Sequence, residues 1–317
     1  MLHKIILALA FTLGLSTSAF SKDILIGVTM AKFDDNFLTV LRNGMEDYVG
    51  DLGGVQLQVE DGQNDMALQI DQINNFISSG VDAIISNPVD TDATVAMTQA
   101  AEAAGIPLVY VNREPINVDS LPSSQAFVGS DEVDSGTQET KAVCQLLKDM
   151  GKGDSAEVVI LVGGLSHMAA RVRTQDVHDV VATPECSFMK VVEEQTANWS
   201  RDEANDLMTN WISGGIEFDA VIANNDEMAI GAIQALKSAG ISMEEMIVAG
   251  IDATQDALSA MAAGDLDVTV FQNAAAQGAG AVDAALTIAK GGSVERVIYI
   301  PFEPVLPENL SDYLDRN

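Results

Sequence analysis

The sequence predicts an α/β fold in which two doubly wound, Rossmann-like lobes each contain a parallel sheet. Short runs of β-branched and other apolar residues recur at intervals of roughly 20 to 30 residues along the chain. Stretches with the apolar spacing of an amphipathic helix lie between these runs. Apolar strands that alternate with helices are typical of parallel sheets covered by helices on both faces.

The predicted strands are short and follow one another along the whole chain. They cover residues 24–30, 55–60, 83–86, 107–112, 158–163, 188–193, 220–224, 247–251 and 268–271. Helical spacing is clearest at residues 67–77 and 228–236, where apolar residues recur every three or four positions. About nine strands are too many for one comfortable sheet, and the alternation restarts near residues 127–131, so we expect two lobes of similar size.

The composition excludes several classes of partner. The 317 residues contain 47 Asp and Glu against 16 Lys and Arg, so the net charge is −31. A surface of this charge repels the phosphate backbone of nucleic acids and anionic lipid headgroups, so neither is an expected partner. The two cysteines and three histidines do not have the spacing of metal ligands, and we expect neither a metal nor another cofactor.

The N-terminal residues have the pattern of a secretory signal peptide. A short basic start that contains Lys4 precedes an apolar run at residues 5–15, which is too short to span the roughly 30 Å hydrocarbon core of a bilayer. The small-x-small sequence AFS at residues 19–21 follows it. We therefore expect residues 1–21 to be a signal peptide that is cleaved near Ser21, and the mature chain to be exported.

The chain has two cysteines, Cys144 and Cys186. Because exported proteins fold under oxidising conditions, we expect the pair to form a disulfide, and two small buried thiols are the alternative. A bridge would close a loop of about 43 residues, and in the chain-entropy description it would stabilise the fold by roughly 4 kcal/mol.

Polar and aromatic side chains follow the predicted strands, at the edge where ligands bind in doubly wound sheets. Carboxylates, amides and guanidinium groups suit the hydroxyls of a polyol, and aromatic rings pack against the C–H faces of a saturated ring. Asp and Asn at such places also form turns and cap helices, which is the alternative for any single position. The candidate ligand-binding residues are Lys32, Phe33, Asp35, Phe37, Asn112, Arg113, Arg171, Trp199, Asn225, Asp252 and Gln272.

The charges among these candidates predict a neutral ligand. Lys32, Arg113 and Arg171 are opposed by Asp35 and Asp252, so the site is close to neutral. A carboxylate or phosphate ligand would favour a clearly positive pocket whose arginines are unopposed by acids. We expect the two acids to accept hydrogen bonds from hydroxyl groups and to orient the arginines.

The glycine-rich segments do not match catalytic motifs. GGLSH at residues 163–167 is not the G-x-S-x-G motif of a serine hydrolase, and GKGD at residues 151–154 lacks the other residues of a phosphate-binding loop. His167 and His178 are expected to be loop or surface residues rather than bases. A sugar-responsive repressor would need a basic DNA-binding segment in place of the apolar N-terminus. We therefore expect a binding protein that is not an enzyme.

Six segments carry a family resemblance. They are VTMAKFDDNFLTVLRNG at 28–44, VNRE at 111–114, SHMAARVR at 166–173, IANNDEMAIG at 222–231, VAGID at 248–252 and VFQN at 270–273. In order along the chain they resemble the periplasmic sugar-binding proteins of ABC importers, of the ribose-binding type and its inositol- and rhizopine-binding branch.

This resemblance implies a type I periplasmic binding protein, in which a three-stranded hinge joins two lobes that close over one ligand. It implies an N-terminal lobe of residues 22–127 plus 273–303 and a C-terminal lobe of residues 128–272 plus 304–317. It also implies a monomer that captures its ligand in the periplasm for a membrane ABC permease, without chemistry on the ligand.

The same resemblance assigns the candidate residues to the binding site and favours myo-inositol. Leu38 stands where ribose binders have a second aromatic residue, Asn112 replaces the acid of their Asp-Arg pair, and Lys32-Phe33 enlarges the first loop. Ribose, galactose or another monosaccharide is the alternative ligand. A role as an autoinducer or chemotaxis receptor, read by a chemoreceptor, is compatible with the same lobes.

Overall fold

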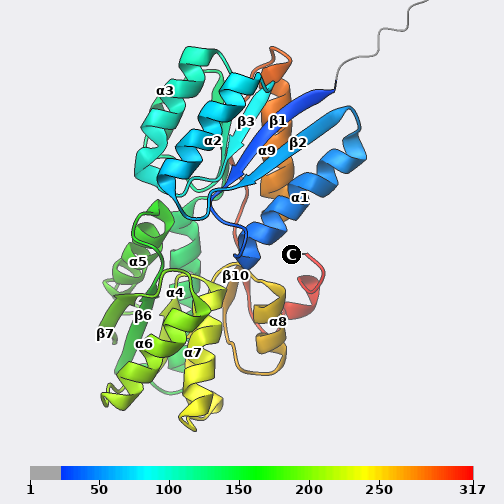
Figure 1. The fold of residues 1–317 in the computed structure, drawn as a ribbon. Helices are drawn as coiled ribbons and strands as arrows, with labels where there is room; N and C mark the ends of the chain where they lie inside the picture. Colours follow the sequence, from blue (N-terminus) through cyan, green and yellow to red (C-terminus); the bar gives the residue numbers. More distant parts are fainter. Residues whose placement is uncertain (1–22, 317) are drawn as a thin grey trace, which may run out of the picture.

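The computed structural model describes residues 23–316, so the predicted signal peptide at residues 1–21 lies outside the described residues. Two lobes of alternating strands and helices lie one above the other, and the chain passes between them three times (Figure 1). None of the helices within residues 23–316 is long and apolar enough to cross a membrane. The predicted α/β fold with two parallel sheets is confirmed.

The first lobe contains a six-stranded parallel sheet with the strand order β11-β5-β4-β3-β1-β2. Helices α1 and α9 cover one face of this sheet, and α2 and α3 cover the other. The elements are β1 (Ile24–Met30), α1 (Asn36–Leu52), β2 (Val55–Asp61), α2 (Met66–Ser79), β3 (Ala83–Ser86), α3 (Thr94–Ala104), β4 (Leu108–Asn112), β5 (Gln125–Gly129), α9 (Ala274–Ala289) and β11 (Val297–Tyr299), with the short 3₁₀ helices η1 (Thr91–Ala93) and η2 (Val118–Ser120).

The second lobe contains a four-stranded parallel sheet with the order β7-β6-β8-β9. Helices α4 and α5 cover one face, and α6, α7 and α8 cover the other. The elements are α4 (Glu132–Asp149), β6 (Ala156–Val162), α5 (Met168–Val181), β7 (Met189–Thr196), α6 (Arg201–Ser213), β8 (Ala220–Ala223), α7 (Asp226–Ser238), η3 (Met243–Glu245), β9 (Ile247–Ala249), α8 (Gln255–Ala262), β10 (Thr269–Phe271), β12 (Glu303–Val305) and η4 (Leu310–Asp312).

Four strands of the first sheet have the same order as the four strands of the second sheet. The order β2-β1-β3-β4 in the first lobe corresponds to β7-β6-β8-β9 in the second. In such sheets the connections reverse direction beside the first strand, and ligands bind there, outside the carboxyl ends of the strands. Residues that follow strands of both sheets line one cavity, so the two carboxyl edges face each other.

Three segments connect the lobes. Residues 130–131 lie between β5 and α4, residues 272–273 between β10 and α9, and residues 300–302 between β11 and β12. Strands β10 and β12 pair with each other in antiparallel orientation at this junction. β5 belongs to the first sheet as far as Gly129, two residues beyond the predicted boundary at residue 127.

Strands β5, β11 and β12 are not predicted by the sequence pattern. β11 and β12 have three residues each, and they are strands because they pair with β5 and β10. Their conformation depends on the strands with which they pair rather than on a local pattern.

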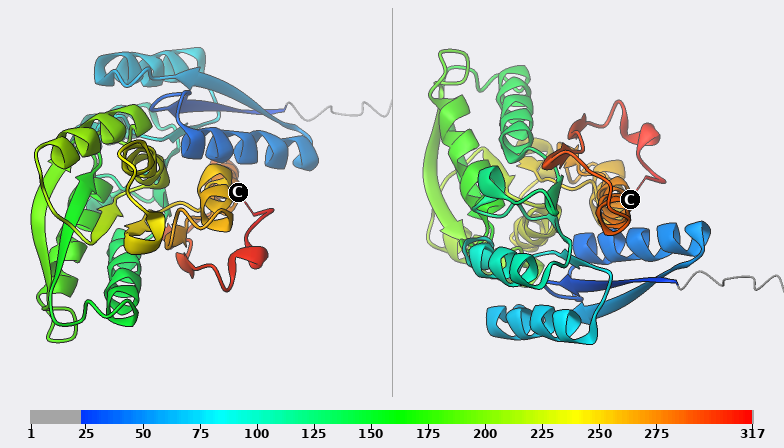
Figure 2. Two further views of the ribbon diagram at one scale, coloured as in Figure 1. Left: turned by 90° about the horizontal axis from the view of Figure 1, so that it is seen from below. Right: turned by 90° about the horizontal axis from the view of Figure 1, so that it is seen from above.

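Helix α9 returns to the first lobe and packs closely against α1 (Figure 2). A Cβ atom added to Gly278 would lie 3.0 Å from the carbonyl oxygen of Leu41, and one added to Gly44 would lie 3.0 Å from the Cα atom of Ala275. These two glycines therefore allow the helix backbones to approach each other.

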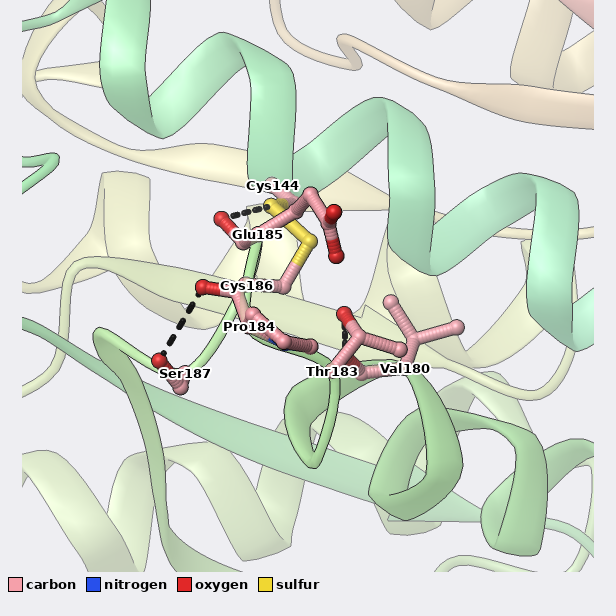
Figure 3. The surroundings of a disulfide bond; sticks show 7 residues. All are labelled: Cys144, Val180, Thr183, Pro184, Glu185, Cys186 and Ser187. Atoms are coloured by element: carbon pink, nitrogen blue, oxygen red, sulfur yellow. Dashed lines mark hydrogen bonds between the residues drawn. A yellow bond between two sulfur atoms is a disulfide. The ribbon is translucent and has the colours of Figure 1, made fainter.

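The predicted disulfide between Cys144 and Cys186 is present (Figure 3). Cys144 lies in α4, Cys186 lies in the turn that connects α5 with β7, and their Cα atoms are 5.8 Å apart. Both residues are buried among apolar side chains of the second lobe. The bridge therefore fastens the α5–β7 connection to α4.

Candidate functional site

A cavity lies between the lobes, at the carboxyl edges of both sheets. Two aromatic residues and a set of buried polar side chains surround it, and both lobes contribute to each kind. The lining residues are Asp35, Phe37, Leu38, Asn112, Arg113, Glu132, His167, Ala169, Arg173, Trp199, Asn225, Asp252 and Gln272.

Arg173 is the most strongly bonded side chain of the second lobe's wall. Its Nε donates to Glu132 Oε2 at 2.7 Å, and its Nη1 donates to the carbonyl oxygen of Asn224 at 2.7 Å. Its Nη2 lies 3.5 Å from Gln272 Oε1. Because α4, the residue after β8 and the segment after β10 each contribute a contact, the guanidinium group is fixed in position before a ligand arrives.

The first lobe holds Arg113 and Asn112 through the loop after β3. Arg113 is 8% exposed, and its Nη1 donates to the carbonyl oxygen of Pro88 at 2.8 Å. Burial lowers the pKa of Arg113 to about 10, while the charge of Asp35 acts in the opposite direction. Asn87 donates through Nδ2 to Asn112 Oδ1 at 3.1 Å, so the amide of Asn112 is oriented from behind.

Asp35 and Asn225 have two roles at once. Asp35 caps α1 by accepting a hydrogen bond from the backbone N–H of Leu38 at 2.9 Å, and Asn225 caps α7 by accepting one from Met228 at 3.1 Å. Both side chains also line the cavity. At these two positions the predicted helix caps are therefore present, and the same side chains lie at the cavity.

Trp199 forms one side of the cavity and packs on the backbone that follows β6. A Cβ atom added to Gly163 would collide with the indole ring, so this position requires glycine. The indole N–H donates to His167 Nδ1 at 2.6 Å. The guanidinium carbon of Arg173 lies 5.8 Å from the centroid of the Trp199 ring.

Left-handed backbone conformations are concentrated among the lining residues. The φ angles are 66° for Asn112, 65° for Trp199 and 128° for Asp252. Non-glycine residues seldom adopt such angles, and strain of this kind is held where the surrounding structure imposes it, often at binding sites. The side chain of Asp252 is buried, and burial raises its pKa well above the ordinary value.

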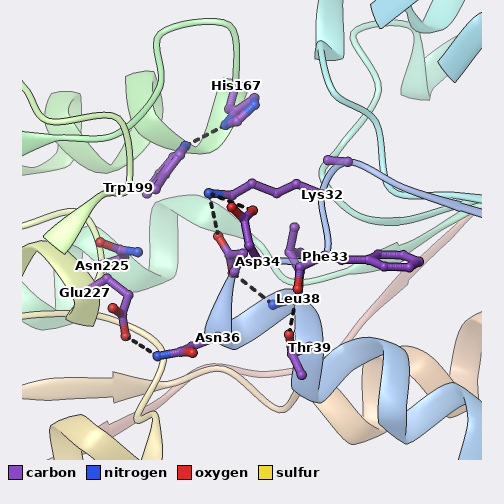
Figure 4. A network of polar contacts seen from close by, with 12 residues as sticks. Lys32, Phe33, Asp34, Asn36, Leu38, Thr39, His167, Trp199, Asn225 and Glu227 are labelled. Atoms are coloured by element: carbon purple, nitrogen blue, oxygen red, sulfur yellow. Dashed lines mark hydrogen bonds and ion pairs between the residues drawn. The ribbon is translucent and has the colours of Figure 1, made fainter. Parts of the chain in front are cut away.

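Three of the predicted site residues do not line the cavity. Arg171 is 40% exposed and forms an ion pair with Asp92 at 3.3 Å. The ring of Phe33 packs against the first lobe's core, where the guanidinium carbon of Arg42 lies 4.4 Å from its centroid. Lys32 points toward Asp34 and Asp35 beside the cavity (Figure 4).

Arg173 lines the cavity and Arg171 does not, for a simple geometric reason. Both residues lie in α5, and two positions along a helix turn the side chain by about 200°, so the two arginines lie on opposite faces. The sequence motif identified the segment that forms α5, but it did not show which face of this helix is buried. The prediction of Asn112, which ends β4, and Arg113, which follows it, did not depend on helical phase, and both line the cavity.

The sequence reasoning also missed Glu132, His167 and Leu38. Glu132 opens α4 directly after the first connection between the lobes, and its only signal was its place at the start of a helix. His167 was expected to be a loop or surface residue; it lies in the loop before α5, and its side chain is buried at 5% exposure. Leu38 was noted for its place in the first loop and lines the cavity beside Phe37.

The charged groups of the observed cavity differ from those that were predicted. Arg113 and Arg173 face Asp35, Glu132 and Asp252. The charges of Arg173 and Glu132 cancel each other, and burial favours the neutral form of Asp252 by raising its pKa. Within residues 23–316 no group of three or more His, Cys, Asp or Glu residues is arranged to hold a metal ion.

The comparison with protein families identifies the architecture. Residues 26–293 match the family described as periplasmic binding protein domain. The chain belongs to this family. Its members are substrate-binding proteins of transporters rather than enzymes, so the resemblance found in the sequence motifs is confirmed.

Several periplasmic binding proteins are similar to this chain over nearly all of its length. The chain is 59% identical over 316 residues to a Rhizobium meliloti protein that is provisionally named rhizopine-binding, and the match covers 100% of both chains. A solute-binding protein of an ABC transporter from Bacillus halodurans, solved with bound myo-inositol, is 40% identical with a TM-score of 0.87, over 95% of this chain and 100% of that one. The myo-inositol-binding protein of Caulobacter, solved with myo-inositol, is 27% identical with a TM-score of 0.80, over 92% and 95%.

Proposed function

We propose that this periplasmic binding protein captures one neutral cyclic polyol, with myo-inositol as the first choice, and delivers it to an ABC permease. The observation that carries the proposal is the cavity between the lobes, where Trp199 and Phe37 supply apolar surfaces and charged or amide groups supply hydrogen bonds. The 40% identity to a protein solved with myo-inositol supports the same ligand.

A saturated six-membered ring fits this set of groups. Its C–H faces pack on aromatic rings, and its rim of hydroxyl groups donates and accepts hydrogen bonds at the same time. Hydrogen bonds to charged partners each contribute roughly 1.5–3 kcal/mol, so several of them give strong and stereospecific binding. We propose as ligand contacts Asp35, Phe37, Asn112, Arg113, Arg173, Trp199, Asn225, Asp252 and Gln272.

The balance of charges favours a neutral ligand over an anionic one. Arg173 is compensated by Glu132 at 2.7 Å, and Arg113 is buried near Asp35. An anionic ligand would have to compete with these carboxylates for the two guanidinium groups, whereas hydroxyl groups can bond to both.

We propose further that the three connecting segments act as a hinge and that the lobes open to admit the ligand. Contacts such as that of Asn36 Nδ2 with Glu227 Oε1 at 2.7 Å join the lobes near the cavity (Figure 4). They would break on opening, while the bonds within each lobe would remain. The lobes would then comprise approximately the residues predicted from the sequence. We propose that the chain is exported and monomeric, and that the permease binds its closed form. A chemoreceptor would bind the same closed form.

Calorimetry of the mature protein with a panel of ligands tests the proposal. We expect heat and thermal stabilisation with myo-inositol, and weaker or no response with ribose and galactose. A ligand at 100 times its dissociation constant raises stability by about 2.7 kcal/mol, which a thermal-shift measurement detects. Micromolar binding of ribose or galactose without any response to myo-inositol would overturn the inositol assignment. A response to rhizopine alone would redirect it to the ligand for which the Rhizobium meliloti relative is named.

A further inference from the structure

His167 joins the two lobes through Nε2 of its ring and holds Trp199, in its own lobe, through Nδ1. It lies in the second lobe, immediately before α5, and its side chain is buried. Its Nε2 lies 2.9 Å from the carbonyl oxygen of Val89, which follows β3 in the first lobe. Its Nδ1 accepts a hydrogen bond from the indole N–H of Trp199 at 2.6 Å (Figure 4).

These two partners determine the protonation state of the ring. A carbonyl oxygen only accepts, so Nε2 must carry the hydrogen in its bond to Val89. An indole N–H only donates, so Nδ1 must be free of hydrogen in its bond to Trp199. The arrangement therefore requires neutral His167, because a proton on Nδ1 would point at the indole hydrogen.

The backbone around His167 is fastened to the first lobe as well. The N–H of Thr91 donates to the carbonyl oxygen of Ser166 at 3.2 Å, and the N–H of Met168 donates to Thr91 Oγ1 at 3.2 Å. We call residues 164–168 the joining loop. It contacts the first lobe through a carbonyl oxygen, a backbone N–H and the imidazole, and the imidazole also holds the ring of Trp199.

The charged groups around the imidazole disfavour protonation in this arrangement. Burial, followed by the charges of Arg113 from the end of β4, Arg171 from α5 and Lys32 from the loop after β1, lowers the pKa of His167 to about 2. The hydrogen bond to Val89 acts in the opposite direction but is weaker than the burial. The carboxylate of Glu203, from α6, lines the same outer hollow as His167 and Lys32.

We propose that His167 is a positioning residue for ligand capture, which in its neutral form fastens Trp199 and the joining loop to the first lobe and which, when protonated, releases them. The inference rests on the proposed function, because it requires an open form in which His167 is in contact with water. It makes closure of the lobes, and with it ligand affinity, dependent on pH.

The sign of the dependence follows from the two states. In the open form the pKa of His167 is close to the ordinary value of about 6.5, and in the closed form the ring has to be neutral. Below about pH 6.5 closure must expel a proton, so affinity falls by up to about tenfold for each pH unit. Between pH 7.5 and pH 5.0 the expected loss of affinity is about 30-fold.

The test compares the affinity for myo-inositol at pH 7.5, 6.0 and 5.0 by calorimetry in three mature proteins. The wild type is expected to lose affinity about 30-fold over this range. The variant His167→Gln keeps one acceptor and one donor without a titrating ring, so its affinity, whatever its value at pH 7.5, is expected to change by less than about threefold between pH 7.5 and pH 5.0. The control His178→Gln changes an exposed ring that contacts Glu194 within the second lobe, and it should behave as wild type.

A second measurement does not depend on a variant. In the NMR spectrum of the wild type, the His167 ring should titrate near pH 6.5 without ligand and should stop titrating above pH 5 with saturating myo-inositol. An unchanged titration with ligand overturns the inference, as does a fall in affinity that persists in His167→Gln. Absence of binding by the wild type at every pH contradicts the proposed function itself, and this outcome is distinct from binding that does not change with pH.

Discussion

Arg173 and Glu132 form an ion pair at 2.7 Å in the wall of the cavity, and both side chains are 4% exposed. Glu132 opens α4, just after the first connection between the lobes, and Arg173 lies on the inner face of α5. A buried pair of this kind costs desolvation energy, so its value here lies in the fixed orientation of the guanidinium group rather than in stability.

The variant Arg173→Gln should weaken binding of myo-inositol at least tenfold, because it removes a charged partner for hydroxyl groups and leaves Glu132 without compensation. Arg171→Gln is the matched control two residues away. Its exposed ion pair with Asp92 contributes little, so affinity should change by less than about threefold. Calorimetry at pH 7.5 measures both, and equal effects of the two substitutions would contradict the corrected site.

Substitutions can also distinguish the aromatic rings that line the cavity from the one that does not. Trp199→Ala and Phe37→Ala each remove an apolar surface of the cavity and should weaken binding at least tenfold. Phe33→Ala removes a ring that packs on Arg42 outside the cavity, so it should lower thermal stability while affinity stays within about threefold. A loss of affinity in Phe33→Ala as large as that in Phe37→Ala would show that the loop after β1 has been assigned the wrong contact residue.

Removal of the disulfide should affect stability and not recognition. The double variant Cys144→Ser and Cys186→Ser opens a loop with a sequence separation of 42 residues, and the expected cost is about 4 kcal/mol. Urea unfolding measures the loss, and calorimetry should return an unchanged affinity because neither residue lines the cavity. Titration of the denatured, unreduced wild type should find no free thiol, and two free thiols would refute the bridge.

Ligand should make the molecule more compact. If the three connecting segments form a hinge, small-angle scattering should give a smaller radius of gyration with saturating myo-inositol than without it. The variant Arg173→Gln, measured at the same ligand concentration, provides a control in which compaction is reduced. Identical profiles of the wild type with and without ligand would exclude closure.

The sequence predicted what depends on periodicity and on chain order. Strand β1 has the predicted bounds, and β3 has them as well, because each is a continuous apolar run between polar segments. Asn112, Arg113 and Asp252 were predicted because they lie at or just beyond the carboxyl ends of strands, where the fold itself brings side chains to one edge.

The sequence did not predict what depends on side-chain orientation or on distant partners. Arg171 and Arg173 differ only in the face of α5 that they occupy, and that face is set by packing of α5 against α4. His167 is part of the site because Val89 and Trp199, from other segments, meet its ring. A contact between segments that are far apart in the sequence leaves no signal in the local sequence pattern.

The return of α9 to the first lobe has a consequence for assembly during synthesis. The first lobe is incomplete until α9 and β11 have been made, since Tyr48 of α1 donates to Asp283 of α9 at 2.7 Å and β11 pairs with β5. The continuous segment from α4 to β10 is made earlier and contains the whole parallel sheet of the second lobe. As the chain is made from its N-terminus, the lobe that begins first is therefore completed last, and the α1 surface that packs against α9 stays uncovered until the last 44 residues, which begin with α9, emerge.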